Sequence, residues 1–308
     1  MNSWQRWFKA PQTHWLRRAL FQIHLWAGIG LGLYVLVIGA SGTALLLKSP
    51  FYGWFEPKYV EIPEGVAPLE GDDLRARMEE VYAGAELGFL IEAFNEGDAT
   101  YIVLNIDGEF IPHYFNQYTG EDNGPARPWP IRSVEWVADI HDDLLLGPQG
   151  RRYNGMAATV FILMSLSGLI IWWQGRSRWY TGLIINPFDR HHGLLWQLHS
   201  FAGFWGLLLM FAWGVSGVQL GWPQGLGTFL GWFGIDQPAR GRGSSGLLGF
   251  FREIHFATPG EGVLVTWLWI LASTIPTLLF VTGLVVWWRR VVVRQWQVWR
   301  FAQATPPA

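Results

Sequence analysis

No cysteine occurs among the 308 residues of this sequence. Without thiols the chain cannot hold an iron–sulfur cluster through cysteine thiolates, attach a c-type haem covalently or form a disulfide bond. The absence of cysteine does not exclude b-type haem, because histidine side chains bind the iron of such haems. Eight histidines are present.

Charged side chains are missing from four long apolar runs. Half of all residues are hydrophobic and 21 are tryptophan. A helix of about 20 residues, rising about 1.5 Å per residue, crosses the hydrocarbon core of a bilayer. The runs that meet this requirement are Leu25–Leu47, Gly155–Trp173, Leu194–Leu220 and Val263–Trp288. We therefore expect an integral membrane protein with four spans. The first run is longer than the apolar region of a signal peptide, so it is interpreted as an uncleaved span.

The charges beside these runs predict the orientation of the chain. With four spans, both termini and the loop between the second and third spans share one side. Most arginines near the spans lie on that side: Arg17, Arg18, Arg176, Arg178, Arg190, Arg289, Arg290, Arg294 and Arg300. This bias predicts that both termini are cytoplasmic. Five arginines lie on the other side, namely Arg151, Arg152, Arg240, Arg242 and Arg252. The loop of residues 51–143 holds 20 of the 24 acidic residues, which favours the outer face.

Two pairs of stretches repeat one spacing of histidine and small residues. His24 and His199 each begin the pattern His-x-x-Ala-Gly, and Ser-Gly follows 17 residues after each histidine. The second pair runs from a histidine through Ser-Gly or Thr-Gly to tryptophan. Its members are His141, Ser167-Gly168 and Trp172 in one stretch, and His255, Thr282-Gly283 and Trp287 in the other. We interpret the pattern as an internal duplication in which each copy carries two histidines and two apolar runs.

The long acidic loop has the pattern of a small α+β domain. Residues 69–82 show helical spacing of apolar side chains, and strand-like runs follow at 88–94, 100–107 and 110–118. Asp107-Gly108 between the last two runs is a hairpin signal. Two short helices are expected at the outer face, over 134–146 and 246–256, and each carries one of the repeated histidines.

The four repeated histidines are expected at two depths of the membrane, two near the inner ends of their spans and two at the outer face. Axial ligation of haem requires imidazoles from two helices and an apolar slot for the macrocycle. A glycine four residues after each inner histidine lies on the same helical face and leaves room for the ring. The expected cofactor-binding residues are His24, His199, Gly28 and Gly203 for an inner haem, and His141 and His255 for an outer haem.

Other interpretations of these residues remain open. Small residues in membrane helices also serve helix packing, and a histidine at the end of a span is often only interfacial. His191 or His192 can replace a ligand, although a basic interfacial role is the favoured alternative. Four outer-face residues are expected to contact a substrate, namely Arg240, Arg242, Trp222 and Trp232. Solvated charge and an aromatic membrane belt are the alternatives for them.

The ordered set of motifs resembles the PepSY-associated transmembrane family, iron-regulated inner-membrane proteins that include ferrisiderophore reductases. The resemblance covers most of the chain. It rests on His24-x-x-Ala-Gly28 with Ser41-Gly42, a loop domain ending in Tyr118-Thr119-Gly120, His141 through Ser167-Gly168 to Trp172, His199-x-x-Ala-Gly203, and Arg252-Glu-Ile-His255 through Thr282-Gly283 to Trp287. It implies b-type haems that carry electrons outward to a ferric chelate in the periplasm. Some relatives have extra spans, and this chain looks like the four-span core.

The expected fold is a membrane all-α four-helix bundle with internal two-fold duplication, plus a small periplasmic α+β PepSY-like domain. The expected boundaries are a cytoplasmic interfacial segment at 1–18, spans at 19–48, 153–174, 191–221 and 261–289, the PepSY-like domain at 49–133, a periplasmic surface helix at 134–150, a cytoplasmic loop at 175–190, a periplasmic loop with a surface helix at 222–260, and a cytoplasmic tail at 290–308.

The expected function is that of a di-haem b cytochrome of the bacterial inner membrane. It takes electrons from an unidentified cytoplasmic-side donor or quinol and reduces a ferrisiderophore or other ferric chelate. One alternative is a haem b subunit that exchanges electrons with quinone or a partner reductase. A second alternative is a non-redox PepSY regulatory or interaction protein. The bilayer is an expected partner in each case, and nucleic acid is not.

Overall fold

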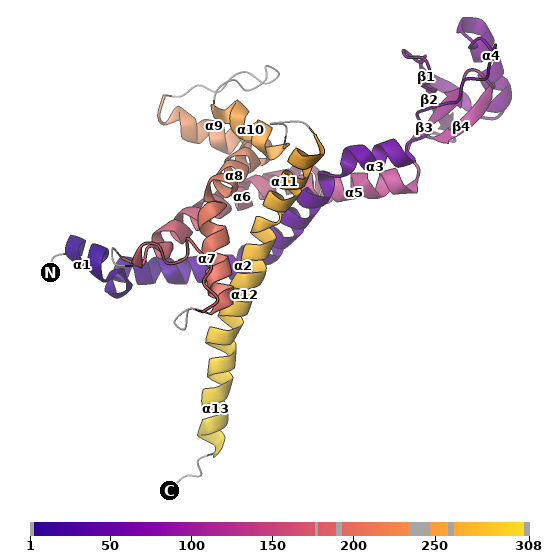
Figure 1. Ribbon diagram of the computed structural model, residues 1–308. Coiled ribbons are helices and arrows are strands. Elements are labelled where there is room, and N and C mark those ends of the chain that lie inside the picture. Colours follow the sequence, from indigo (N-terminus) through magenta and orange to yellow (C-terminus); the bar gives the residue numbers. More distant parts are fainter. Residues whose placement is uncertain (1–2, 176–177, 189–192, 235–246, 258–261, 305–308) are drawn as a thin grey trace. The chain divides into compact units, whose positions relative to one another are not determined.

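The computed structural model describes residues 3–175, 178–188, 193–234, 247–257 and 262–304 (Figure 1). His191, His192, Arg240 and Arg242 lie outside the described residues. The chain divides into two compact units, Met1–Leu46 with Ala138–Ala308, and Leu47–Val137. We refer to the first as the membrane unit and to the second as the sheet unit.

The membrane unit is built from helices. They are α1 (Ser3–Lys9), the 3-10 turn η1 (Pro11–Thr13), α2 (Trp15–Leu45), α6 (Gly147–Trp172), α7 (Leu194–Trp205), α8 (Leu207–Gly221), α9 (Pro223–Gly231), α10 (Leu247–His255), α11 (Val263–Ser273), α12 (Ile275–Trp287), the π-helical segment η3 (Trp288–Val293) and α13 (Arg294–Ala304). The end of α5 (Trp129–Asp143) also belongs to this unit.

Within the described residues, three helices are long and apolar enough to cross a membrane: Trp15–Leu45, Gly147–Trp172 and Val263–Gln297. The expected third span is instead a pair of helices, α7 and α8, that meet at an angle of 62°. The chain is therefore a membrane protein with three candidate spans, or four if the bent pair crosses as one span.

The bend at Gly206 allows the expected third span to contact two different helices. α7 packs against α12, whereas α8 packs against α6, and α2 contacts both α6 and α12. A Cβ atom at Gly206 would lie 2.7 Å from the backbone oxygen of Ala202 and 2.8 Å from Cγ2 of Ile275. A side chain at this position would therefore disturb both the bend and the approach of α12, which glycine alone permits.

The sheet unit contains one antiparallel sheet of four strands in the order β1-β2-β3-β4. The strands are β1 (Glu86–Ile91), β2 (Thr100–Ile106), β3 (Glu109–Asn116) and β4 (Glu121–Pro125), and two further helices are α3 (Lys48–Phe55) and α4 (Gly71–Val81). Ile106 pairs with Glu109, so Asp107 and Gly108 form a two-residue hairpin turn. Both have positive φ, 54° and 87°, as the expected Asp-Gly turn requires.

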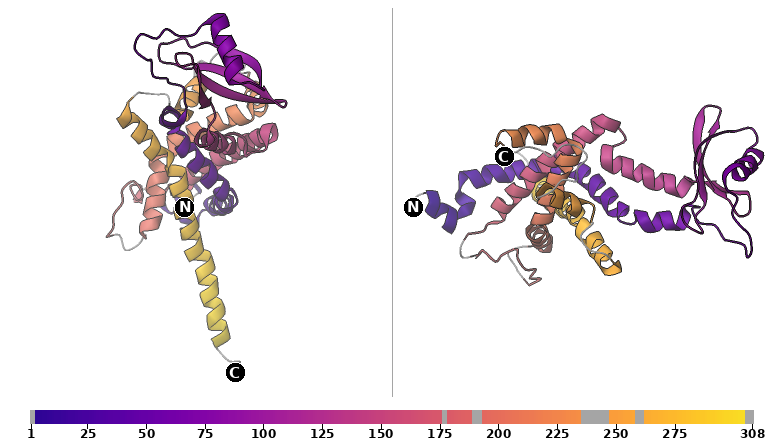
Figure 2. Two further views of the ribbon diagram at one scale, coloured as in Figure 1. Left: turned by 90° about the vertical axis from the view of Figure 1, so that its right-hand side faces the viewer. Right: turned by 90° about the horizontal axis from the view of Figure 1, so that it is seen from above.

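Helix α4 covers one face of this sheet (Figure 2). Leu74 and Met78 of α4 form a buried core with Ile102, Leu104 and Phe115 of the central strands. Alternation of side chains along β2 places Ile102 and Leu104 on that same face. The expected helix and three strands are therefore present, in a mostly helical membrane protein with a small α+β domain.

The sequence analysis missed several elements. Strand β4 was not expected, because Glu121–Pro125 contains Gly, Pro and Asp, which are rare in strands. It lies at the edge of the sheet, where these residues are tolerated. Helices α3 and α9 were not predicted, and both contain proline and glycine; the proline of α9 is at its first turn, where a missing N–H costs nothing.

Candidate functional site

Each of the four repeated histidines contacts a hydroxyl on another helix. Nδ1 of His24 lies 3.0 Å from Oγ of Ser167 and 3.1 Å from the backbone oxygen of Met164. Nδ1 of His141 lies 3.2 Å from Oγ of Ser41 and 3.1 Å from the backbone oxygen of Ile38. The hydroxyl and the carbonyl three residues before it therefore form one acceptor site for each of these two imidazoles.

The other two histidines make the same kind of contact. Nδ1 of His199 lies 3.0 Å from Oγ1 of Thr282. Nδ1 of His255 lies 2.8 Å from Oγ of Ser216. All four hydroxyls thus belong to the Ser-Gly and Thr-Gly steps that the sequence repeat singles out, and each step receives one histidine.

The hydroxyls determine which ring nitrogen carries the proton. Each hydroxyl has a single hydrogen, and each lies within 2.7–2.9 Å of a carbonyl oxygen of its own helix, as an O–H donor does: Ser41 to Val37, Ser167 to Met164, Ser216 to Ala212 and Thr282 to Leu278. Toward the imidazole the hydroxyl oxygen must therefore accept, and Nδ1 must donate. In its neutral form each of these histidines then has its lone pair on Nε2, the arrangement that a metal-binding imidazole adopts when its other nitrogen is held by the protein.

Glycine allows three of these imidazoles to lie against the neighbouring backbone. A Cβ atom at Gly42 would lie 2.8 Å from Cε1 of His141, and one at Gly168 would lie 3.2 Å from Cε1 of His24. Gly283 has the same relation to His199, at 3.2 Å. The fourth step differs, because a Cβ at Gly217 would meet Cβ of Ala158 at 2.9 Å.

Gly28 and Gly203, the expected positions beside the macrocycle, are less crowded. A Cβ at Gly28 would have its nearest neighbour in Sδ of Met164 at 3.8 Å, and one at Gly203 in Cδ2 of Leu279 at 3.6 Å. Both distances are ordinary van der Waals contacts with the flexible ends of side chains. The space beside these two glycines is therefore compatible with the predicted role.

Two of the four repeated histidines, His141 and His255, lie side by side. The ring centroids of His141 and His255 are 6.0 Å apart with an angle of 57° between the planes. His24 lies on α2 and His199 on α7, and both helices pack against α12. Two imidazoles on opposite sides of one metal have centroids about 6 Å apart, since a metal–nitrogen bond is about 2 Å long and the centroid lies about 1 Å further out. The second pair therefore has the separation that axial ligation requires.

Two imidazoles suit a haem better than a bare ion. A tetrahedral zinc site takes three or four protein ligands, and no cluster of three or more His, Cys, Asp or Glu side chains occurs within the described ranges. A haem supplies four nitrogens of its own and needs only two axial ligands. The donor set of each pair therefore fits a bis-imidazole haem.

Of the four predicted substrate residues, Trp222 and Trp232 lie within the described part of the chain. Trp232 is 76% exposed, whereas Trp222 packs against Gly155 and Gly225. A Cβ at Gly155 of α6 would lie 2.4 Å from Cβ of Trp222, and one at Gly225 would overlap the Trp222 indole. Trp222 therefore has a packing role between α6 and α9, and its predicted contact with a substrate is untested.

The sequence analysis missed Asn154, which holds the end of the helix that carries His141. This buried residue of α6 donates from Nδ2 to the backbone oxygens of His141 and Asp142, at 2.8 Å each. It thereby satisfies two carbonyls at the C-terminus of α5, where a helix leaves such groups without partners. The repeat could not reveal it, because the corresponding stretch after His255 has Leu268 thirteen residues on.

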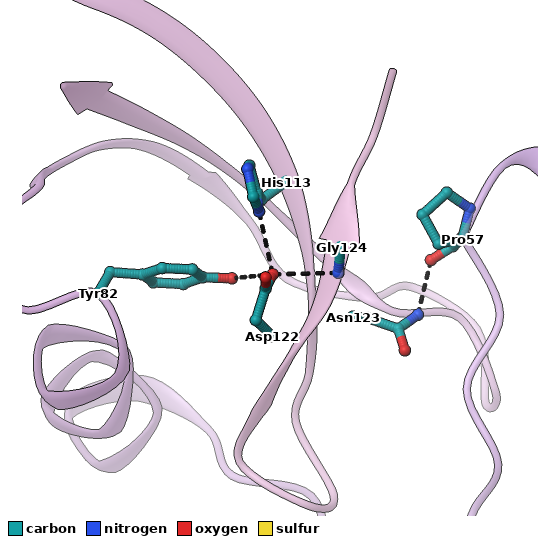
Figure 3. A network of polar contacts seen from close by, with 6 residues as sticks. All are labelled: Pro57, Tyr82, His113, Asp122, Asn123 and Gly124. Atoms are coloured by element: carbon teal, nitrogen blue, oxygen red, sulfur yellow. Dashed lines mark hydrogen bonds and ion pairs between the residues drawn. The ribbon is translucent and has the colours of Figure 1, made fainter. Parts of the chain in front are cut away.

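The sheet unit holds a separate polar network around Asp122 (Figure 3). Oδ1 of Asp122 accepts hydrogen bonds from the Tyr82 hydroxyl at 2.7 Å, Nδ1 of His113 at 3.0 Å and the Gly124 amide at 3.1 Å. Burial alone raises the pKa of Asp122, but the hydrogen bonds from His113, Tyr82 and Gly124 outweigh it and bring the pKa below its ordinary value. The three side chains come from different elements, so their spacing in the sequence gave no signal.

Comparison with known proteins gives a family for the chain. A search of curated proteins found no significant match. The sequence model of the PepSY-associated TM region matches residues 21–240, which include three of the four repeated histidines and the whole sheet unit. The predicted resemblance is thereby confirmed at the level of the family, and the chain belongs to the PepSY-associated TM region family.

Proposed function

We propose that the membrane unit binds two b-type haems and conducts electrons across a bacterial inner membrane. One haem is held by His24 and His199, and the other by His141 and His255. The observation that carries the proposal is the fourfold Nδ1 contact: every repeated imidazole is fixed through Nδ1 by another helix, and its Nε2 remains available as a ligand. Helix packing alone does not require four histidines in this one arrangement.

The helices determine how such ligands would be held. The partners of each pair are contributed by different helices, α2 with α7 and α5 with α10. Each imidazole is anchored by a third helix, since Ser167 belongs to α6 and Ser216 to α8. Anchoring through Nδ1 fixes ring orientation and raises the basicity of Nε2. A bound haem supplies one-electron chemistry at its iron, and the protein supplies ligands, orientation and a medium of low polarity.

The orientation of the chain and its family resemblance together support an outward direction of electron flow. The basic residues predict cytoplasmic termini, which puts His24 and His199 toward the cytoplasm and His141 and His255 toward the periplasm. The likeness to ferrisiderophore reductases then favours reduction of a ferric chelate on the outer side. One electron converts Fe³⁺ to Fe²⁺, which hard oxygen ligands hold less tightly, so the metal is released.

An absorption spectrum of detergent-purified protein tests the cofactor directly. We expect a Soret band that shifts on dithionite addition, sharp α and β bands of six-coordinate low-spin haem, and close to two haems per chain by the pyridine haemochrome assay. A colourless protein would refute the redox proposal and favour a regulatory PepSY protein. A ratio of one haem per chain would remove one of the two sites.

The acceptor is tested separately with chemically reduced protein under anaerobic conditions. Addition of a ferrisiderophore should reoxidise the haems, and ferrozine should capture the Fe²⁺ that is formed. Reoxidation by quinone, with no response to a panel of ferric chelates, would replace ferric reduction with the quinone-linked alternative.

A further inference from the structure

A small pocket in the sheet unit lies between α3 and the segment that follows this helix. Its volume is about 320 Å³, and the residues that line it are Lys48, Ser49, Tyr52, Gly53, Glu56, Lys58 and Tyr59. Ligand pockets in proteins have volumes from roughly 300 Å³ upward, so a pocket at this lower limit suits a small polar group. All of these residues belong to one compact unit, so the pocket is complete within it.

The spacing of residues along α3 creates the hollow. Lys48, Tyr52 and Glu56 follow one another at intervals of four residues, so they form one ridge along a face of the helix. Gly53 lies beside this ridge, and a Cβ atom at Gly53 would have no neighbour within 4 Å. The pocket therefore has open space beside Gly53, with an ammonium group at one end of the ridge and a carboxylate at the other.

The segment that forms the second wall is fixed to the sheet. The backbone oxygen of Pro57 accepts a hydrogen bond from Nδ2 of Asn123 at 2.7 Å (Figure 3). Oε1 of Glu56 accepts a hydrogen bond from the hydroxyl of Tyr114 at 2.8 Å, and Tyr114 is a buried residue of β3. The carboxylate of Glu56 is therefore held in one place by the sheet.

The pocket contains opposite charges that do not pair with each other. Within the described residues neither Lys48 nor Glu56 forms an ion pair, and Lys58 contacts Asp98 at 3.9 Å. Nζ of Lys48 lies 5.3 Å from the centre of the Tyr52 ring, a cation–π distance. An ammonium group only donates hydrogen bonds and a carboxylate only accepts them. A ligand that matches both groups carries an anion and a cation with N–H groups, as a phosphate joined to a primary amine does.

The place of the pocket in the sequence indicates the source of such a ligand. Lys48 is the first charged residue after the apolar run Leu25–Leu47, so it directly follows the candidate span Trp15–Leu45. Outside the pocket, α3 carries Trp54, which is 74% exposed, and the exposed ring of Phe55. Exposed aromatic rings at the end of a span are typical of the membrane interface, where phospholipid headgroups lie.

We propose that this pocket binds the phosphoethanolamine headgroup of a membrane phospholipid. Lys48, with the Ser49 hydroxyl beside it, binds the phosphate, and Glu56 binds the primary ammonium group. The proposal does not involve haem and is therefore independent of the proposed function. A phosphoglycerol headgroup would leave Glu56 without a cation, and inorganic phosphate would do the same without being held at the membrane. The experiment distinguishes these two ligands from phosphoethanolamine.

The experiment titrates the delipidated full-length protein in detergent with dioleoyl phospholipids and measures the dissociation constant of the first bound lipid by native mass spectrometry. We expect phosphatidylethanolamine to bind about tenfold more tightly than phosphatidylglycerol, which has no ammonium group to pair with Glu56. Phosphatidylcholine, whose ammonium has no N–H group, should bind like phosphatidylglycerol. Inorganic phosphate should not displace phosphatidylethanolamine.

Two variants test the assigned roles. Lys48→Gln should weaken the binding of both phosphatidylethanolamine and phosphatidylglycerol by about tenfold, because both carry the phosphate. Glu56→Gln should weaken phosphatidylethanolamine only, because the amide still accepts a hydrogen bond from Tyr114 but no longer attracts an ammonium group. Lys9→Gln and Glu61→Gln remove exposed charges outside the pocket, so they are the matched controls and should change neither affinity.

Retained binding of phosphatidylglycerol by Glu56→Gln shows that the variant is folded, so a selective loss of phosphatidylethanolamine is not a folding defect. Equal affinity of the unaltered chain for the two lipids would overturn the proposal. So would an unchanged affinity of Lys48→Gln, or equal weakening of both lipids in the folded, monodisperse fraction of Glu56→Gln. Displacement of the lipid by inorganic phosphate would also overturn it and would assign the pocket to a soluble anion.

Discussion

The two histidine pairs share one contact and differ in how closely glycine lets their imidazoles approach the neighbouring helix. In both pairs Nδ1 is held by a hydroxyl of a Ser-Gly or Thr-Gly step. In the first pair Gly168 and Gly283 lie against the two imidazoles, whereas in the second pair Gly42 lies against His141 but Gly217 faces Ala158. The contact that holds each imidazole is therefore repeated with the sequence motif. The space beside each pair depends instead on which helices pack there.

The largest expected effect separates the pairs. Replacement of His24 or His199 by alanine should remove one haem and leave the other, and replacement of His141 or His255 should remove the complementary one. The physical reason is that each iron loses one of only two protein ligands. Redox titration of each variant resolves which component disappears. Loss of the same component in His24→Ala and His141→Ala would falsify the pairing.

A smaller change should distinguish crowded from open glycines. In Gly42→Ala the new Cβ would lie 2.8 Å from Cε1 of His141, so the imidazole must move and second-pair haem should fall severalfold. Gly28→Ala is the matched control, because its nearest neighbour is 3.8 Å away, and haem content should be unchanged.

Gly28→Leu and Gly203→Leu should lower the occupancy of the first-pair haem, because the leucine side chain would fill the space predicted for the macrocycle. Haem is measured in the folded, monodisperse fraction, and full occupancy there in the leucine variants would show that these glycines serve helix packing only.

Asn154 tests the asymmetry of the second pair. Asn154→Ala removes both hydrogen bonds to the end of α5 and leaves the backbone oxygens of His141 and Asp142 without this partner. We expect a loss of about 1–3 kcal/mol in stability, together with weaker binding of second-pair haem only. Thermal unfolding and haem titration measure the two effects. Tyr34→Phe, which removes a 3.4 Å contact to the Asn154 backbone, is the control. An equal response of both haems would argue against a local clamp.

The hydroxyls should have graded effects. His255 contacts the Ser216 hydroxyl through Nδ1, whereas Nδ1 of His141 contacts a backbone oxygen in addition to Ser41. Ser216→Ala should therefore weaken the binding of the second-pair haem by about tenfold, and Ser41→Ala should weaken it by less. Loss of the Nδ1 partner lowers imidazole basicity, so the reduction potential should rise. Spectroelectrochemical titration measures the shift, and a greater effect of Ser41→Ala would contradict the grading.

The smallest effect is expected in the sheet unit. Hydrogen bonds depress the pKa of Asp122 in the folded chain, so their stabilisation is complete above the unfolded carboxyl pKa and is lost as pH falls through the folded value. The Asp122 side chain is 38% exposed, so the gain should be about 1 kcal/mol or less. The protection factors of the β3 and β4 amides, which are corrected for the slower intrinsic exchange in acid, should fall on acidification below about pH 4. Asp122→Asn should flatten that dependence; an unchanged profile would assign it to other carboxylates.

Much of this protein follows from residue spacing alone. The apolar runs predict the membrane class and the Asp107-Gly108 pair predicts the β2–β3 turn, because both signals are local in the sequence. The repeated motifs predict the family through their order along the chain. The interval between His24 and Ser41 is fixed by helical rise, so their different depths could be deduced before any packing was known.

Tertiary structure decided which groups meet. The sequence did not show that His24 rests on Ser167 while His141 rests on Ser41, nor that a bend at Gly206 divides one apolar run between α6 and α12. Asn154 and the Asp122 network likewise join residues from separate elements. Backbone geometry fixes distances along a helix, but contacts between helices depend on side-chain packing over the whole unit, which no single spacing encodes.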